Sequence, residues 1–172
     1  MVILLKFNDD RIYKNLLPDR VYPGIYDVDM AGLRSAGIKG LILDVDNTLK
    51  PPGPGGPDEK ALDWIDAARE SGFGICLLSN SLRGRVLKFS SGLGVYSVVG
   101  AKKPAAAGFI KAIRLLGLDA SRICVIGDQI YTDVLGAKRL GLMAVYTLPM
   151  TKKEEFTVAL KRILEYPILK RY

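Results

Sequence analysis

Five short apolar runs alternate with segments of helical periodicity along most of this chain of 172 residues. The runs lie at residues 38–44, 73–78, 95–99, 122–126 and 143–147. Apolar runs of this length, bounded by turn residues, are typical of strands that are buried on both faces of a parallel sheet. Helices between such strands form right-handed crossover units. The pattern therefore predicts an α/β fold: a doubly wound, Rossmann-like parallel sheet within a three-layer αβα arrangement.

The segments between these runs carry start and stop signals for helices. Asp58 can cap a helix that ends near Gly72. Asp27 or Asp29 can cap a shorter helix that ends at Gly37. Further helices are expected around Val86 and Phe89, from Pro104 to Gly117, over 132–140, and after the capping-box pair Thr151 and Glu154.

The length of the chain is that of one domain. We divide residues 1–172 into an N-terminal extension (1–37), a core (38–147) and a C-terminal helix (151–172). The apolar start of the chain lacks the basic leader and the cleavage site of a signal peptide. No segment approaches the roughly 20 apolar residues of a membrane span. We therefore expect a cytoplasmic protein.

Composition narrows the chemistry that such a sheet can carry. Histidine is absent, which excludes Ser-His-Asp and Cys-His catalysis and any metal site built on histidine. Cys76 and Cys124 lie within apolar runs, so we expect reduced, buried packing residues. The net charge of +7 favours an anionic partner, which can be a phosphate ester, a nucleic acid or an acidic membrane surface, although such a charge can also serve solubility alone.

Two carboxylates follow the first apolar run, in the segment 41–49 (LILDVDNTL). Asp44 and Asp46 thus fall at the carboxyl end of a strand, where open α/β sheets bind their ligands. Two buried aspartates side by side are costly without a cation that neutralises them. The segment therefore predicts a Mg²⁺ site with a nucleophile. The alternative is that one aspartate caps the next element and the other is solvated.

Polar groups follow the other strands as well. They are Ser79 and Asn80 after the second run, Lys102 and Lys103 after the third, and Asp128 and Asp133 after the fourth. The carboxyl ends of parallel strands meet at one edge of the sheet, so these groups are expected to converge there. An acidic, a hydroxyl, a cationic and again an acidic residue thus follow four successive strands. This combination favours a functional site over a chance arrangement of polar residues.

These four segments resemble the motifs of the haloacid dehalogenase-like phosphohydrolases. The segment 44–49 matches their DxDxT signature, and 78–80, 103–104 and 127–133 are similar to the second, third and fourth motifs in the same order. The flanking residues, Leu17-Pro18, 25–27 and 37–40, are similar to the YqeG-type branch of subfamily IIIA. That branch includes bacterial proteins and relatives of mitochondrial phosphatidylglycerophosphate phosphatase.

The resemblance implies a role for each group. Asp44 would attack phosphorus and form an aspartyl-phosphate, and Asp46 would protonate the leaving oxygen and later activate water. Ser79 would donate a hydrogen bond to a phosphoryl oxygen, and Lys103 would offset negative charge. Mg²⁺ would bind the carboxylates of Asp44 and Asp128 and the backbone carbonyl of Asp46, with Asp133 supporting the metal shell.

The residues expected near the substrate are Thr48, Asn80 and Arg83. Of these, Thr48 is expected to orient Asp46. Arg83, like Arg85, can meet an anionic substrate or be an ordinary exposed arginine. Lys102 can equally be a solvated neighbour of Lys103 or a catalytic group.

Many relatives carry a cap domain over the site, but neither insertion point of this chain has room for one. We therefore expect a capless, open site, covered by the Pro/Gly loop at 50–57 or by a neighbouring subunit of a homo-oligomer. An open site suits a substrate whose own bulk excludes water, and together with the charge of +7 the YqeG-type resemblance implies a phosphorylated lipid such as phosphatidylglycerophosphate. The alternatives are a small soluble sugar or nucleotide phosphate, a phosphoacceptor signalling module, and a phosphate-binding protein without turnover.

The C-terminal segment leaves two interpretations open. Lys161, Arg162, Lys170 and Arg171 accompany apolar residues there, which suits either a helix packed on the sheet with a solvated basic face or a peripheral helix on an anionic membrane. The aromatic residues show no stacking pattern, so no specific nucleic acid is expected as a partner.

Overall fold

The computed structural model describes residues 13–53, 58–81, 90, 93–151 and 156–170. Its centre is a sheet of six strands in the order β1-β6-β5-β2-β3-β4, and every neighbouring pair is parallel. The strands are β1 (Arg20–Tyr22), β2 (Gly40–Leu43), β3 (Gly74–Leu78), β4 (Tyr96–Val98), β5 (Ile123–Gly127) and β6 (Met143–Thr147). The predicted α/β class with a doubly wound parallel sheet is thereby confirmed.

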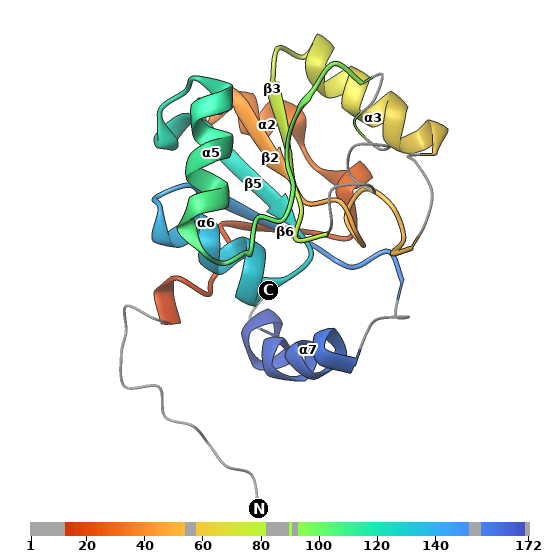
Figure 1. The fold of residues 1–172 in the computed structure, drawn as a ribbon, viewed down its shortest axis with the longest axis vertical. Helices are drawn as coiled ribbons and strands as arrows, with labels where there is room; N and C mark the ends of the chain where they lie inside the picture. The colour runs from red at the N-terminus through yellow and green to blue at the C-terminus, as the bar shows by residue number, and fades with distance from the viewer. Residues whose placement is uncertain (1–12, 54–57, 82–89, 91–92, 152–155, 171–172) are drawn as a thin grey trace, which may run out of the picture.

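Helices cover both faces of this sheet (Figure 1). Helices α2 (Met30–Ser35) and α3 (Glu59–Glu70) lie on one face, and α5 (Ala106–Leu116) and α6 (Leu135–Arg139) lie on the other. Short turns of helix, η1 (Ile25–Asp27), η2 (Ala120–Arg122) and the wide π-turn η3 (Ile130–Val134), precede α2, β5 and α6. Helix α7 (Phe156–Leu169) lies apart from these layers, on the side toward which β2 and β5 point (Figure 1).

Strand β1 was not anticipated from the sequence and lies within the segment predicted as an N-terminal extension. Three residues that include an arginine do not form an apolar run, so the strand is recognisable only from its partner. It extends the sheet beside β6, with Val21 in register with Tyr146. The Asp19 carboxylate fixes this edge, because it accepts from the backbone N–H of Ala144 over 2.7 Å.

Several helix boundaries follow the predicted signals. Asp29 accepts from the backbone N–H of Gly32, and Asp58 accepts from that of Ala61, so both act as N-caps. Helix α5 ends at Gly117, whose φ of +64° lies in the left-handed region that glycine tolerates. The predictions around Val86 and Phe89 and at Glu154 fall outside the described residues.

Two predicted helix starts were wrong. Helix α5 begins at Ala106, two residues after Pro104, because Lys102 to Ala105 form a turn first. The helix predicted over 132–140 begins earlier, as the π-turn η3, and becomes α-helical only at Leu135. The Asp133 carboxylate accepts from the backbone N–H of Gln129 in this turn, an interaction that hydrophobic periodicity does not reveal.

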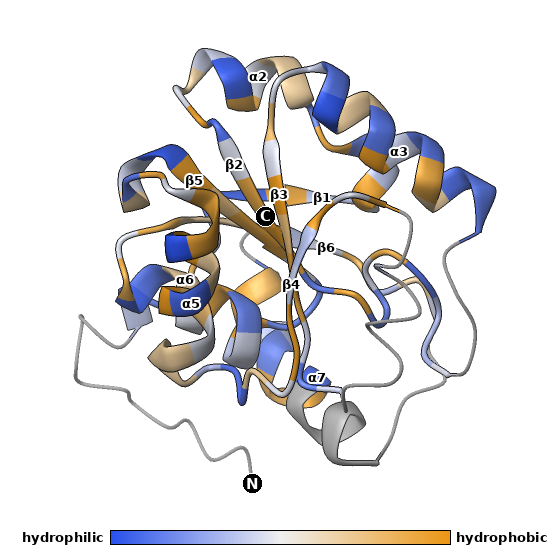
Figure 2. Cartoon of the chain, turned by 45° about the horizontal axis from the view of Figure 1, so that its top comes forward, coloured by the Kyte–Doolittle hydropathy of each residue, from blue (hydrophilic) through white to orange (hydrophobic). Residues whose placement is uncertain are grey.

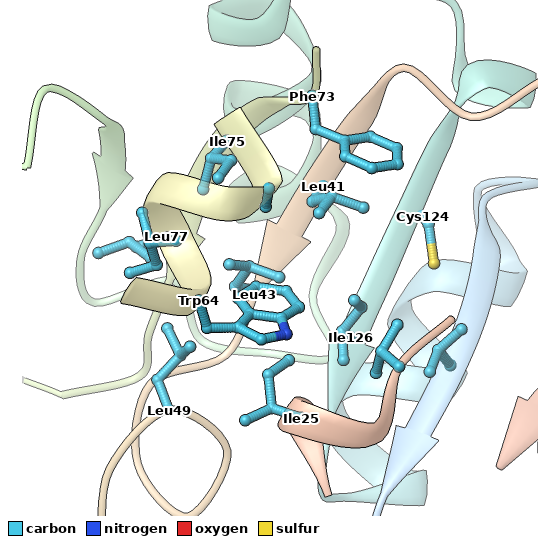
Figure 3. Close-up of a cluster of buried hydrophobic side chains, with 14 of the residues drawn as sticks. Ile25, Leu41, Leu43, Leu49, Trp64, Phe73, Ile75, Leu77, Cys124 and Ile126 are labelled. Atoms are coloured by element: carbon cyan, nitrogen blue, oxygen red, sulfur yellow. The ribbon is translucent and has the colours of Figure 1, made fainter. Parts of the chain in front are cut away.

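The core consists of one apolar layer on each face of the sheet. Figure 3 shows the layer beneath α2 and α3, where Trp64 of α3 packs over Leu43 and Ile25. Phe109 of α5 anchors the opposite layer. Cys76 and Cys124 are buried free thiols, as expected. In the hydropathy view the central strands are mostly apolar toward their carboxyl ends, whereas α3 alternates between polar and apolar residues (Figure 2). Within the described part of the chain, no helix is both long and apolar enough to cross a membrane.

Candidate active site

The candidate site lies at the carboxyl ends of β2 and β5, in the middle of the sheet. From β2 the chain continues to β3 and β4 on one side, and from β5 it continues to β6 on the other. This reversal of direction is where open α/β sheets bind ligands. The backbone N–H of Asp44 donates to the carbonyl of Ile126 over 2.9 Å, so the residue after β2 stays attached to β5.

The side chain of Lys103 joins two carboxylates at this point. Its ammonium group donates to Asp44 Oδ1 and, over 2.6 Å, to Asp133 Oδ1. All three side chains are buried. The loops that carry them follow three different strands, so the convergence predicted at this sheet edge is present in the structure. Lys102, in contrast, is exposed, and Lys103 alone of the pair enters the site.

A third carboxylate completes the group. Oxygen atoms of Asp44, Asp128 and Asp133 all lie within 4.8 Å of one another, and the three residues are buried. Gly127 leaves room for this arrangement, since a Cβ atom there would lie 2.4 Å from Asp133 Cγ. Buried, convergent carboxylate oxygens are the ligands that Mg²⁺ prefers, so the donor set fits the predicted metal.

The charge balance of the group is unfavourable without a further cation. Burial raises the pKa of Asp44 to about 6, with Lys103 opposing the rise and Asp133 adding to it. Burial also raises the pKa of Asp128 well above its usual range, and its two carboxylate neighbours reinforce that shift. Burial alone would lower the pKa of Lys103, but Asp133 and Asp44 raise it above its ordinary value. Lys103 therefore stays charged. Lys103 and Arg162, whose guanidinium opposes the rise in the pKa of Asp128, carry two positive charges against three carboxylates, so the group favours binding of an additional cation.

The carboxylate of Asp46 stands outside this group. Its Oδ2 accepts from the Ser81 hydroxyl over 2.7 Å, and its Oδ1 lies 3.3 Å from Lys50 Nζ. The sharp turn after it depends on Asn47, whose φ of +66° lies in a region that asparagine tolerates better than most residues. Two acidic side chains one residue apart therefore lie in different surroundings, one buried against Lys103 and one part-exposed between a hydroxyl and an ammonium.

Ser79, Asn80 and Thr48 also lie at this edge. The Ser79 hydroxyl is buried and accepts from the backbone N–H of Ser81 over 3.0 Å. The Asn80 amide bonds to the Lys103 backbone, accepting from its N–H over 2.7 Å and donating to its carbonyl over 3.3 Å. Asn80 thus fixes the loop that carries the lysine.

The expectation that Thr48 orients Asp46 is not met in the structure. The Thr48 hydroxyl donates to Asp128 Oδ1 over 3.4 Å, so it touches a member of the carboxylate group instead. The turn at Asn47 separates Asp46 from Thr48, which explains why proximity in the sequence does not bring the two side chains together.

Comparison with known proteins adds an independent result. The sequence model of the haloacid dehalogenase-like hydrolases matches residues 53–141, which is just over half of the chain and includes Ser79, Lys103 and Asp128. This chain belongs to the haloacid dehalogenase-like hydrolases. The predictions of this superfamily, of an enzyme and of its phosphatase class are thereby confirmed.

Relatives of this hydrolase agree with that assignment. It is 32% identical to the "Probable phosphatase YqeG" of Bacillus subtilis over 91% of each chain. It is 27% identical to the "Phosphatidylglycerophosphate phosphatase 1, chloroplastic" of Chlamydomonas reinhardtii, over 87% of this chain and 59% of that longer relative. A haloacid dehalogenase-like hydrolase of Brucella suis shares the fold, with a TM-score of 0.54 over 77% of this chain and 95% of that one, at 14% identity.

Residues that the motifs did not reveal also reach the site of this hydrolase. Lys50 and Ser81 contact Asp46 as described above, and Arg162 of α7 donates to both the carboxylate and the backbone carbonyl of Asp128. Glu165 accepts from Arg162 over 3.0 Å. Of these residues, only Ser81 could have been suspected from the sequence, because it lies two residues after Ser79. The contact of Arg162 could not, because it depends on where α7 packs. Arg83 and Arg85 lie outside the described residues.

Proposed function

We propose that this hydrolase is a Mg²⁺-dependent phosphomonoesterase that acts through an aspartyl-phosphate intermediate on Asp44. The observation that carries the proposal is the group formed by Lys103 and the three carboxylates. Asp44 and a phosphoryl group are both anionic, so the carboxylate can approach phosphorus only when positive charge lies beside it. Lys103 supplies one such charge, and the two neighbouring carboxylates can hold a metal ion that supplies more.

Asp44 and Asp46 divide the work in this proposal. Asp44 attacks phosphorus through a carboxylate oxygen, and the bond from phosphorus to the ester oxygen breaks. Asp46 gives its proton to that leaving oxygen and then takes a proton from the water that hydrolyses the acyl phosphate. The separate surroundings of the two side chains support these separate roles, since Lys103 contacts only the first among the contacts described above.

Asp44 and Asp128 would hold Mg²⁺ through carboxylate oxygens, and Asp46 through its backbone carbonyl. The bound ion supplies positive charge that offsets the phosphoryl and carboxylate oxygens. Asp133 keeps Lys103 in place over 2.6 Å and thereby supports the group. Ser79 donates a hydrogen bond from its hydroxyl to a phosphoryl oxygen. Its hydroxyl oxygen accepts from the Ser81 N–H, which leaves the hydroxyl hydrogen available for that bond.

For the substrate, we propose a phosphorylated lipid of the phosphatidylglycerophosphate type. The proposal is supported by the named activity of the Chlamydomonas relative and by the net charge of +7, which favours an anionic surface. A small soluble sugar or nucleotide phosphate is the alternative.

The reaction is tested with p-nitrophenyl phosphate in the presence and absence of Mg²⁺. We expect turnover that EDTA abolishes and Mg²⁺ restores. Asp44→Asn should lower turnover at least about a thousandfold, since the amide cannot act as the nucleophile. Asp66→Asn, on the exposed face of α3, is the matched control and should leave turnover unchanged. If Asp44→Asn retained turnover within about tenfold of the parent, Asp44 would lose this role.

The substrate is tested separately. Catalytic efficiency on phosphatidylglycerophosphate in mixed micelles is compared with that on a panel of soluble sugar and nucleotide phosphates. Preference for the lipid supports the proposal. Preference for a soluble metabolite would refute the lipid assignment and leave the phosphatase chemistry intact.

A further inference from the structure

Helix α7 has an inward and an outward face over the described residues 162–170. Arg162, Glu165 and Ile168 follow each other at helical spacing and point inward, and Glu165 and Ile168 are buried. Ile163, Leu164 and Tyr166 lie on the opposite side, with 68%, 53% and 65% of their surface exposed. The charged side chains of Arg162 and Glu165 therefore face the protein, while three large apolar side chains face solvent, which is unusual for an amphipathic helix. Of the basic residues noted in this segment, Arg162 points inward and Lys170 is exposed, whereas the side chains of Lys161 and Arg171 lie outside the described part of the structure.

Polar contacts on the inward side fix this orientation. Arg162 donates to Asp128, and Glu165 Oε1 accepts from the backbone N–H of Ile130 over 2.7 Å. The Tyr131 hydroxyl donates to the carbonyl of Leu164 over 3.3 Å. A rotation of α7 that buried its apolar face would break these contacts and leave the Glu165 carboxylate without its partners. The apolar side chains are consequently held in solvent.

The outward face has the composition of an interfacial helix. Pro167 and Lys170 are also exposed and continue it. A tyrosine and a lysine beside aliphatic side chains suit the boundary between head groups and acyl chains, since each pairs an apolar body with a polar tip. Among the described residues, six large apolar side chains are exposed, and three of them lie within residues 163–166 of α7. Such a patch favours an interaction surface over chance exposure.

We propose that this face, formed by Ile163, Leu164, Tyr166, Pro167 and Lys170, docks on the surface of a bilayer that contains anionic phospholipid. The proposal deepens the proposed function, because Arg162 of the same helix touches the site. Docking through α7 would place the carboxylate group beside lipid head groups, where a phosphorylated lipid is held. The net charge of +7 complements an anionic surface.

A second copy of the chain is a weaker candidate for the occupant. One face of about two helical turns is small against the roughly 800 Å² that each partner contributes to a stable interface. Two copies of a chain with a charge of +7 also repel each other. Neither objection applies to a membrane, into which a few side chains insert.

The test is co-sedimentation of the full chain with vesicles of phosphatidylcholine, with and without phosphatidylglycerol. We expect binding to the anionic vesicles, and binding about tenfold weaker or more for Ile163→Glu combined with Leu164→Glu. Tyr96→Glu is the control, because Tyr96 is exposed to a similar degree on β4. All variants should keep the parent turnover of p-nitrophenyl phosphate, since the substituted side chains point away from the site. Tyr166→Ser is a second variant in case the double change fails to fold.

The outcomes separate the two proposals. Membrane docking would be refuted if the parent did not bind anionic vesicles, or if the α7 variants bound them as tightly as the parent and the control do. A dimer in solution that the α7 variants dissociate would instead assign this face to self-association. Vesicle binding without any turnover would refute the proposed function and leave the docking surface standing.

Discussion

Lys50 Nζ lies 3.3 Å from Asp46 Oδ1 and also donates to the backbone carbonyls of Pro51 and Gly53. One buried ammonium group therefore ties the start of the Pro/Gly loop to the side chain proposed as general acid. The Ser81 hydroxyl holds the other carboxylate oxygen. Both carboxylate oxygens of Asp46 are thus held by neighbouring side chains.

Replacing Lys50 by methionine should impair Asp46 as a proton donor. We expect turnover of an alkyl phosphate to fall about tenfold or more, because a misplaced catalytic group loses its alignment with the leaving oxygen. Turnover of p-nitrophenyl phosphate should fall less, since a good leaving group needs little protonation. Steady-state kinetics on both esters measure this, with the exposed Lys102→Met as control. Equal losses on the two esters would mean that Lys50 supports the loop and not the proton transfer.

Asp44→Asn should stabilise the metal-free protein at neutral pH. Below about pH 4 the Asp44 carboxyl is protonated in both the folded and the unfolded chain, so it carries no penalty. Because burial raises its pKa to about 6 in the fold, the free energy of unfolding falls as pH rises from about 4 through 6. The amide does not ionise and escapes this loss.

Urea denaturation in EDTA at several pH values measures the effect. The stability of Asp44→Asn relative to the parent should grow by about 1 to 3 kcal/mol between pH 4 and 7. Other acidic groups titrate in both proteins, so the difference isolates Asp44. A difference that does not vary with pH would contradict the shift.

Arg162→Ala should make the fold depend more strongly on a divalent cation. Without the guanidinium, the Asp128 carboxylate is buried without its ion-pair partner, which should lower the free energy of unfolding by about 2–4 kcal/mol. Added Mg²⁺ should then raise Tm by more than it does in the parent. Thermal denaturation with and without Mg²⁺ measures both quantities, with Arg139→Ala on the exposed side of α6 as control. Identical Mg²⁺ responses in the two variants would show that Arg162 does not balance Asp128.

Gly127→Ala should disrupt the carboxylate group from within. The new Cβ would lie 2.4 Å from Asp133 Cγ, so Asp133 must move and its bond to Lys103 weakens. We expect a loss of about 1–3 kcal/mol of stability, typical of overpacking, together with strongly reduced turnover. Gly74→Ala is the control, since its Cβ would meet the flexible Leu116 side chain at 3.3 Å. Unaltered kinetics in Gly127→Ala would indicate that Asp133 can shift without consequence.

The sequence predicted the part of the site that depends on strand ends. Asp44, Lys103 and Asp128 could be placed together because parallel strands end at one edge, whatever the order of the strands. Lys50 and Arg162 could not, because their contacts depend on the path of a loop and on the packing of a distant helix. Strand β1 was missed for a similar reason, since its pairing with β6 is a long-range contact without a local pattern.

The pairing of β1 with β6 also has a consequence for how the chain folds. β1 is the first of the described strands to leave the ribosome, and its neighbour in the sheet is the last, with Asp19 and its partner Ala144 125 positions apart. The other five strands can associate while β1 is still unpaired. We therefore expect this edge to close after the rest of the sheet, so that weakening it should accelerate unfolding more than it slows folding. β1 is thus synthesised before the other described strands but is expected to pair last.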